Sequence, residues 1–137
     1  MMKENLIREK SYSFALQAIA LYRQLCKNGE YVLSKQLLRS ATSIGANVEE
    51  AQAAQSKADF VAKMSIASKE ARETNYWLRL LRDSEICTID VEKLLSDSES
   101  IINILTAIIK SSSLKYSKSS VQNSKSKIQN PKSNNVP

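Results

Sequence analysis

The 137-residue chain has no histidine and only two glycines, two prolines and two cysteines. Without histidine, a His-based triad, a histidine general base, a zinc protease site and the Glu-x-x-His motifs of di-iron bundles are excluded. Gly29 and Gly45 lie 16 residues apart, too far for a phosphate-binding or dinucleotide-binding glycine loop. These absences favour a non-enzymatic protein without a cofactor or a small-molecule substrate.

Long apolar runs and paired cysteines are also missing. No run approaches the length of about 18 apolar residues at which a membrane span is suspected, and the polar N-terminus lacks the apolar core of a signal peptide. Cys26 and Cys87 are isolated, so the chain has no CxxC motif and is no disulfide scaffold. We therefore expect a cytoplasmic protein with no membrane partner.

Carboxylates cluster at two places, Glu49-Glu50 and Glu70 with Glu73. A hard cation needs several oxygen ligands that converge on one point. Helical spacing instead favours ion pairs between these acids and basic residues on the same helix. The sequence therefore predicts no metal site.

The formal net charge of +6 is distributed unevenly. Residues 113–137 hold five lysines and no acid, which leaves residues 1–112 with 15 basic and 14 acidic groups. Sixteen of these last 25 residues are Ser, Asn or Lys, and both prolines lie among them. Such a segment buries too little apolar surface to order itself, so we expect a disordered basic tail. It is either a solvated extension without a task or a weak polyanion-binding segment.

Apolar residues in the first 112 positions recur at helical spacing. Gly29 after Asn28 is typical of a helix end, and Ser56 with Asp59 resembles a capping box at a helix start. The pattern predicts helices over about 4–27, 32–55, 57–84 and 89–112. Four long helices with short connections indicate an all-α, antiparallel up-down-up-down four-helix bundle in residues 1–112, followed by the disordered tail.

The third and fourth predicted helices each carry a second apolar ridge beside the seam that faces the bundle. A bundle monomer needs one apolar stripe per helix, and a large exposed patch usually marks an interface. We therefore expect an oligomer; alternatively, the last helix lies centrally and buries both of its ridges within the chain. The candidate interface residues are Ile66, Trp77, Leu80, Leu94, Ile101, Ile104 and Ile108.

The predicted helix over 57–84 has a basic face with one aromatic residue, nearly opposite its apolar seam. Four of its residues fall within an arc of about 80°, and two basic residues of the preceding helix extend the face. Cations interleaved with an aromatic ring can bind phosphates and stack a base. Alternatively, nearby acids neutralise a face that is merely solvated. The candidate nucleic-acid contacts are Lys35, Arg39, Lys69, Arg72, Tyr76, Arg79 and Arg82.

Two segments carry a family resemblance. Residues 31–51, YVLSKQLLRSATSIGANVEEA, and residues 70–78, EARETNYWL, resemble the four-helix-bundle family first named for proteins encoded in intervening sequences of bacterial 23S rRNA genes. The resemblance covers about residues 5–110 and leaves out the tail.

The resemblance implies a short bundle that assembles into a ring, commonly a homopentamer. Related proteins, the accessory variability proteins of diversity-generating retroelements, are basic rings that bind a reverse transcriptase and nucleic acid. The expected partners are therefore further copies of this chain and RNA, DNA or a nucleoprotein such as a reverse transcriptase. The alternative is a purely protein-binding scaffold, in which the apolar ridges contact the partner and the basic face is only solvated.

Overall fold

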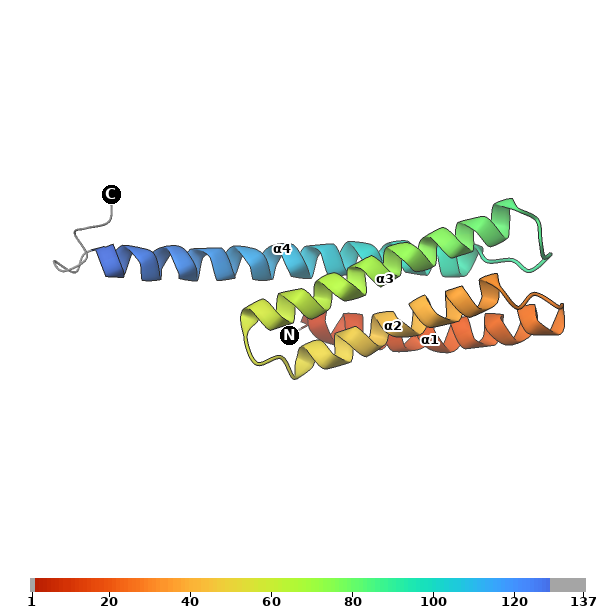
Figure 1. The fold of residues 1–137 in the computed structure, drawn as a ribbon, viewed down its shortest axis with the longest axis horizontal. Helices are drawn as coiled ribbons and strands as arrows, with labels where there is room; N and C mark the ends of the chain where they lie inside the picture. Colours follow the sequence, from red (N-terminus) through yellow and green to blue (C-terminus); the bar gives the residue numbers. More distant parts are fainter. Residues whose placement is uncertain (1, 129–137) are drawn as a thin grey trace.

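Four α-helices account for most of residues 2–128, the part of the chain that the computed structural model describes (Figure 1). Helix α1 spans Met2–Lys27, α2 Leu33–Gln52, α3 Lys57–Asp83 and α4 Glu92–Ile128. Successive helices run antiparallel, and no strand occurs in this part of the chain (Figure 1). The predicted all-α four-helix bundle is thus confirmed.

Each helix packs against two others. Helix α2 lies between α1 and α3, and α4 contacts α3 and α1, so that α1 and α3 are diagonally opposed. The common core holds Phe14, Leu37, Ile44, Leu78 and Leu105, all buried. Each such side chain stabilises the fold by about 1.5–3 kcal/mol relative to an exposed one.

Small polar side chains cross-link the helices inside this core. Thr74 Oγ1 of α3 lies 2.8 Å from Ser40 Oγ of α2, and Asn75 Nδ2 donates to Ser98 Oγ of α4 at 2.9 Å. Every buried side-chain nitrogen and oxygen of the described residues has a hydrogen-bond partner. Because satisfied buried networks tolerate few alternative arrangements, these contacts hold α3 in register with both neighbours.

The second apolar ridge of α4 is not available as an interface. Leu94, Ile101 and Ile108 are buried within the chain, so their prediction as interface residues was wrong. The physical reason is that α4 packs against both α1 and α3, which requires an apolar arc wide enough for two neighbours. Ile104 is half-buried and packs on the same core. The alternative of a helix that buries both ridges is the correct one.

Helix α4 is also longer than predicted. It continues to Ile128, past the ends of the other three helices (Figure 1), whereas the sequence led us to expect a helix end at 112 and disorder from 113. Residues 113–130 contain neither glycine nor proline. The sequence therefore has no helix-breaking residue before Pro131. Residues 129–137 of the predicted tail lie outside the described residues.

A buried carboxylate organises the turn between α1 and α2. Gly29, with φ of 84°, ends α1 as predicted. Glu30 then accepts hydrogen bonds from the backbone amides of Val32, Leu33 and Ser34 at 3.1, 2.8 and 2.7 Å. Burial raises the pKa of Glu30, but the hydrogen bonds from Leu33, Ser34 and Val32 outweigh it and leave the pKa below its ordinary value. The sequence did not indicate this cap.

None of the helices in residues 2–128 combines the length and apolar character that crossing a membrane requires.

We expect Glu30→Gln to lower the free energy of unfolding near neutral pH by about 1 kcal/mol, because an amide accepts these hydrogen bonds less strongly than a carboxylate. The depressed pKa makes the contribution of the carboxylate complete above the ordinary glutamate pKa of about 4.3; it is lost as the pH falls through the lower folded-state value. Urea unfolding of both proteins across that range measures the difference. The exposed Glu99→Gln is the control, and a gap between Glu30→Gln and the parent that stays constant down to low pH would contradict the role of the charge.

Candidate nucleic-acid interface

Four predicted contacts lie together on the outer face of α3. Ser56 Oγ accepts a hydrogen bond from Asp59 N at 3.1 Å and caps the start of this helix, as predicted. From there α3 runs without interruption, so residues spaced by three and four positions align. Lys69, Arg72, Tyr76 and Arg79, hereafter the α3 stripe, are all exposed.

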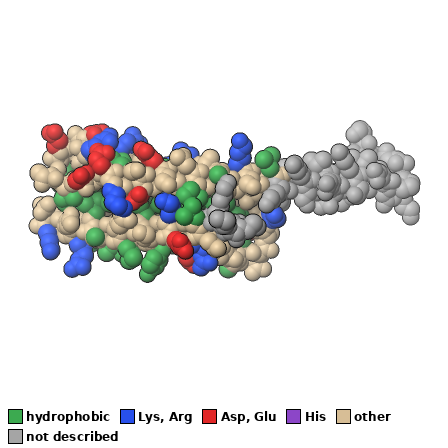
Figure 2. All heavy atoms as spheres, turned by 180° about the vertical axis from the view of Figure 1, so that it is seen from behind, with side chains coloured by type: hydrophobic (Ala, Val, Ile, Leu, Met, Phe, Trp, Pro, Cys, Tyr) green, Lys and Arg blue, Asp and Glu red, His purple; other side chains and the backbone are tan. Residues whose placement is uncertain are grey.

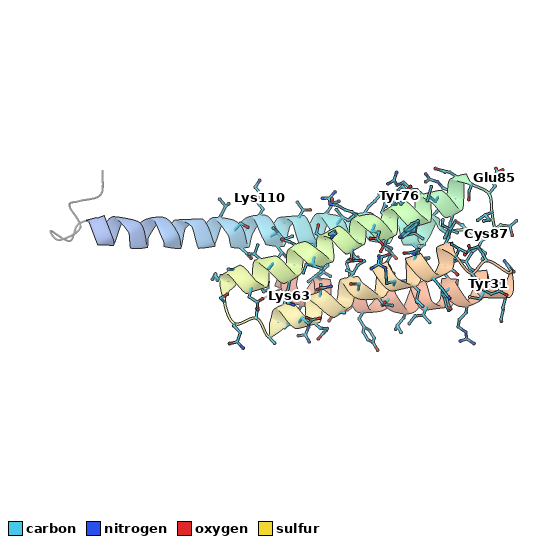
Figure 3. All side chains as sticks on the ribbon, in the orientation of Figure 1. Tyr31, Lys63, Tyr76, Glu85, Cys87 and Lys110 are labelled. Carbon is cyan, nitrogen blue, oxygen red and sulfur yellow. The ribbon has the colours of Figure 1, made fainter. Side chains whose placement is uncertain are left out.

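Tyr76, labelled in Figure 3, is held between a cation and a second ring. The Arg79 guanidinium carbon lies 5.7 Å from the centre of its ring. The Trp77 ring meets it edge-on, with centroids 5.3 Å apart. Arg79 Nε also donates to Asn75 Oδ1 at 3.0 Å, which restrains the guanidinium. An exposed ring beside a fixed cation can stack a base while the cation binds a phosphate.

Several cations on this side of the bundle have no carboxylate partner. Within the described residues, Lys69, Arg72 and Arg79 form no ion pair, and neither does the exposed Lys35 of α2. Their charge is therefore available to an anionic ligand. The structure brings together three cations and one aromatic ring on α3, with Lys35 on the neighbouring helix.

Arg39 is engaged in a cross-helix ion pair. Its guanidinium on α2 binds Glu70 Oε2 at 3.3 Å and also Glu73, both on α3. Glu73 in turn accepts a hydrogen bond from Trp77 Nε1 at 3.1 Å. Burial by itself would lower the pKa of Arg39. The hydrogen bond to Glu73 and the negative charges of Glu70 and Glu73 outweigh burial and leave the pKa above its ordinary value. These contacts make Arg39 a link between α2 and α3 and leave it little charge to offer a ligand.

Arg82 is neutralised in a similar way at the end of α3. It binds Asp83 Oδ1 at 2.7 Å and approaches Glu92 Oε1 of α4 at 3.8 Å. The hydrogen bond from Arg82 lowers the pKa of Asp83. Two of the seven predicted nucleic-acid contacts are thus tied to carboxylates.

The clustered acids pair with basic residues of neighbouring helices. Glu49 binds Arg8 of α1 at 3.4 Å, and Glu50 binds Lys63 of α3 at 3.0 Å. The expectation that Glu70 and Glu73 pair along their own helix was wrong, because Arg39 of the adjacent α2 reaches both. No group of three potential metal ligands converges among the described residues.

Comparison with known proteins assigns this bundle to a protein family. The family model of the 23S rRNA-intervening sequence protein matches residues 3–107. The chain belongs to this family. The family match includes the whole α3 stripe and ends inside α4.

A solved structure supports the same assignment. It is a crystal structure of a protein of unknown function from the S23 ribosomal protein family of Bacteroides thetaiotaomicron VPI-5482. The two chains share 49% sequence identity with a TM-score of 0.76, over 79% of this chain and 98% of the other. No curated protein matches the sequence.

The structure exposes an apolar surface on this family member that sequence reasoning missed. Of the predicted interface residues on α3, Ile66 is exposed, Trp77 is half-buried against the core, and Leu80 is half-buried. On α1, Tyr12 and Leu16 are more exposed than any of these. The signal that could have found them is their spacing along the side of α1 opposite the core, and the exposed Ile19 belongs to the same line.

Replacing Glu73 tests the link between α2 and α3. We expect Glu73→Ala to lower the free energy of unfolding by about 1 kcal/mol, because the variant loses the Arg39 ion pair and the acceptor for the Trp77 indole. Urea unfolding, followed by the fluorescence of the single tryptophan and by circular dichroism, measures the change. Glu99→Ala, on an exposed part of α4, is the control. Equal losses in the two variants would contradict the structural role of Glu73.

Proposed function

We propose that this member of the 23S rRNA-intervening sequence protein family is a non-enzymatic helical bundle that binds RNA through the α3 stripe. The observation that carries the proposal is the exposed Tyr76 ring beside the Arg79 guanidinium, with the unpaired Arg72 and Lys69 on the same line. The family name links these proteins to sequences within 23S rRNA genes, which makes RNA the first nucleic acid to test.

The dimensions of the stripe suit a short single-stranded segment. Residues 69–79 extend for about 15 Å along α3, at 1.5 Å per residue. An aromatic ring supplies stacking energy of about 1–3 kcal/mol per base in single-strand binding proteins, and the flanking cations neutralise phosphates. A helix surface with one exposed ring can stack an unpaired base but cannot reach the bases in the deep, narrow major groove of an RNA duplex.

Self-association forms the second part of the proposal. One stripe contains only three cations, and residues 1–112 carry almost no net charge, so a single bundle neutralises few phosphates. Several copies in one particle would add their electrostatic fields and raise affinity for one RNA. A homopentameric ring, as the resemblance implies, would present five stripes, and a pair would present two. A nucleoprotein such as a reverse transcriptase complex is a second source of the bound RNA.

The exposed apolar residues of α1 favour a second candidate function, that of a protein-binding scaffold. Apolar patches of this kind usually mark contacts with proteins. In a scaffold the α3 stripe would be solvated and without a ligand. The two functions differ in which surface, when altered, abolishes partner binding.

The charge-reversal variant Arg72→Glu/Arg79→Glu tests RNA binding. We expect it to weaken binding to single-stranded RNA at least about tenfold near 0.15 M salt and to flatten the dependence of log affinity on log salt by about two contacts. Fluorescence anisotropy of a labelled oligonucleotide measures affinity, and quenching of Trp77, which touches Tyr76, reports a base stacked at this place. Circular dichroism confirms that the variant folds.

A second double variant provides a control matched in charge. Lys57→Glu/Lys110→Glu changes the net charge by the same amount at two exposed positions outside the stripe, and Lys110 is labelled on α4 in Figure 3. It should leave most of the affinity intact. If both double variants lose binding equally, or if neither does, the α3 stripe is not the RNA site and the scaffold function is favoured.

A further inference from the structure

We propose that Asn75 and Ser98 are positioning residues of the α3 stripe, which hold the Arg79 guanidinium in place to bind one phosphate of the RNA backbone beside Tyr76. The inference rests on the proposed function and deepens it, because it distinguishes Arg79 from the other cations of the stripe. Neither Asn75 of α3 nor Ser98 of α4 was among the residues that the sequence pattern indicated.

A chain of three hydrogen bonds connects the backbone of α4 to Arg79. Ser98 Oγ is fully buried and donates to the Leu95 carbonyl oxygen at 2.7 Å. Asn75 Nδ2 donates to Ser98 Oγ at 2.9 Å, and Asn75 Oδ1 accepts from Arg79 Nε at 3.0 Å. One half-buried amide therefore joins an exposed guanidinium to the buried side of the neighbouring helix.

The orientation of the Asn75 amide is fixed from both sides. The hydroxyl hydrogen of Ser98 is used in the bond to Leu95, so Ser98 Oγ accepts a hydrogen bond from Asn75. Arg79 Nε carries a hydrogen and accepts none, so it needs an acceptor. Only the orientation with Nδ2 toward α4 and Oδ1 toward Arg79 satisfies both neighbours. Asn75 therefore restrains the guanidinium that it binds.

A neutral amide orients Arg79 without cancelling its charge. Arg39 and Arg82, in contrast, are neutralised by the same carboxylates that orient them. Asp83 lies one turn after Arg79, but it is bound by Arg82, whose hydrogen bond lowers the pKa of Asp83 more than the charge of Arg79 does. In the part of the chain that the structure describes, Arg79 forms no ion pair. Its full charge is therefore directed at a ligand.

The two terminal amino groups of Arg79 are left for that ligand. Among the described residues, its side chain makes one hydrogen bond, from Nε to Asn75. The ring of Tyr76, labelled in Figure 3, lies 5.7 Å from the guanidinium carbon and restricts its movement on one side. Two amino groups of one guanidinium can bind a phosphate in a bidentate manner. One unpaired nucleotide can then offer its phosphate to Arg79 and its base to Tyr76.

Two substitutions at Asn75 separate the orientation of Arg79 from its charge. Asn75→Leu removes the acceptor and keeps the charge of Arg79, so binding to single-stranded RNA should weaken about threefold to tenfold with an unchanged salt dependence. Asn75→Asp supplies a carboxylate that pairs with Arg79, so the salt dependence should also fall by about one phosphate contact. Anisotropy of a labelled oligonucleotide, titrated over a salt series, measures both quantities.

Asn47 of α2 provides a matched control. It is also half-buried, and its Nδ2 donates to the Ser43 carbonyl oxygen at 2.9 Å and to Ser43 Oγ at 3.2 Å. It makes no hydrogen bond to a residue of the α3 stripe. Asn47→Leu removes an amide of the same kind and should leave the RNA affinity unchanged.

A double-mutant cycle shows whether Asn75 acts through Arg79. In a chain that already carries Arg79→Ala, the substitution Asn75→Leu should cost no further affinity, because no guanidinium is left to orient. Ser98→Ala removes the anchor of the amide without adding volume, so it repeats the test if Asn75→Leu does not fold. An equal loss of affinity with and without Arg79 means that Asn75 has only a structural role, and the proposal is then overturned.

The restraint on Arg79 can also be measured without RNA. The Arg79 Nε–H signal in a nitrogen–proton correlation spectrum is identified by its loss in Arg79→Ala. Its hydrogen should exchange with water more slowly in the unaltered chain than in Asn75→Leu, because the hydrogen bond to Oδ1 protects it. Equal exchange rates in the two proteins contradict the restraint.

The outcomes separate this inference from the proposed function. If the unaltered chain binds no RNA, or binds it as well with Arg72→Glu/Arg79→Glu, the α3 stripe is not the RNA site and the positioning role falls with it. If that charge reversal abolishes binding while Asn75→Leu binds as tightly as Asn47→Leu, only the positioning role is overturned. Circular dichroism and urea unfolding confirm that each variant is folded.

Discussion

Every helix of this bundle packs against two neighbouring helices, and the remaining features of the structure depend on that constraint. Helix α4 contacts both α1 and α3, so both of its apolar ridges pack into the core. Only the outward arc of each helix is left to carry function. On α3 that arc is cationic with one aromatic ring, and on α1 it is apolar with a charge at either end.

Basic residues of this family member fall into two groups according to their partners. Arg39 and Arg82 are held by carboxylates and connect neighbouring helices. Arg72 and Arg79 lie on an arc that carboxylates of α2 and α4 do not reach, and they stay free of ion pairs within the described residues. Net charge, which is close to zero for residues 1–112, therefore conceals a local cationic surface.

The two outward surfaces lie on diagonally opposed helices, and this separation lets them act together. A partner bound on the outer face of α1 would therefore leave the α3 stripe facing solvent. A particle with several α3 stripes would contact more phosphates than one bundle and would lose less entropy on binding each further stripe. The core holds the α3 surface in place, because the Ser40–Thr74 contact fixes α3 relative to α2 and the Asn75–Ser98 contact fixes it relative to α4.

The sequence by itself determined the helical class, the number of helices, the end of α1 at Gly29 and the cap of α3 at Ser56, because these depend on spacing and local backbone chemistry. It also placed Lys69, Arg72, Tyr76 and Arg79 on one line, since angles around a single helix follow from residue number. Only the tertiary structure decided which arcs are covered. Burial of Leu94 and Ile101, the carboxylate partners of Arg39 and the exposure of Tyr12 and Leu16 all depend on which helix lies alongside, and periodicity within one helix does not specify its neighbours.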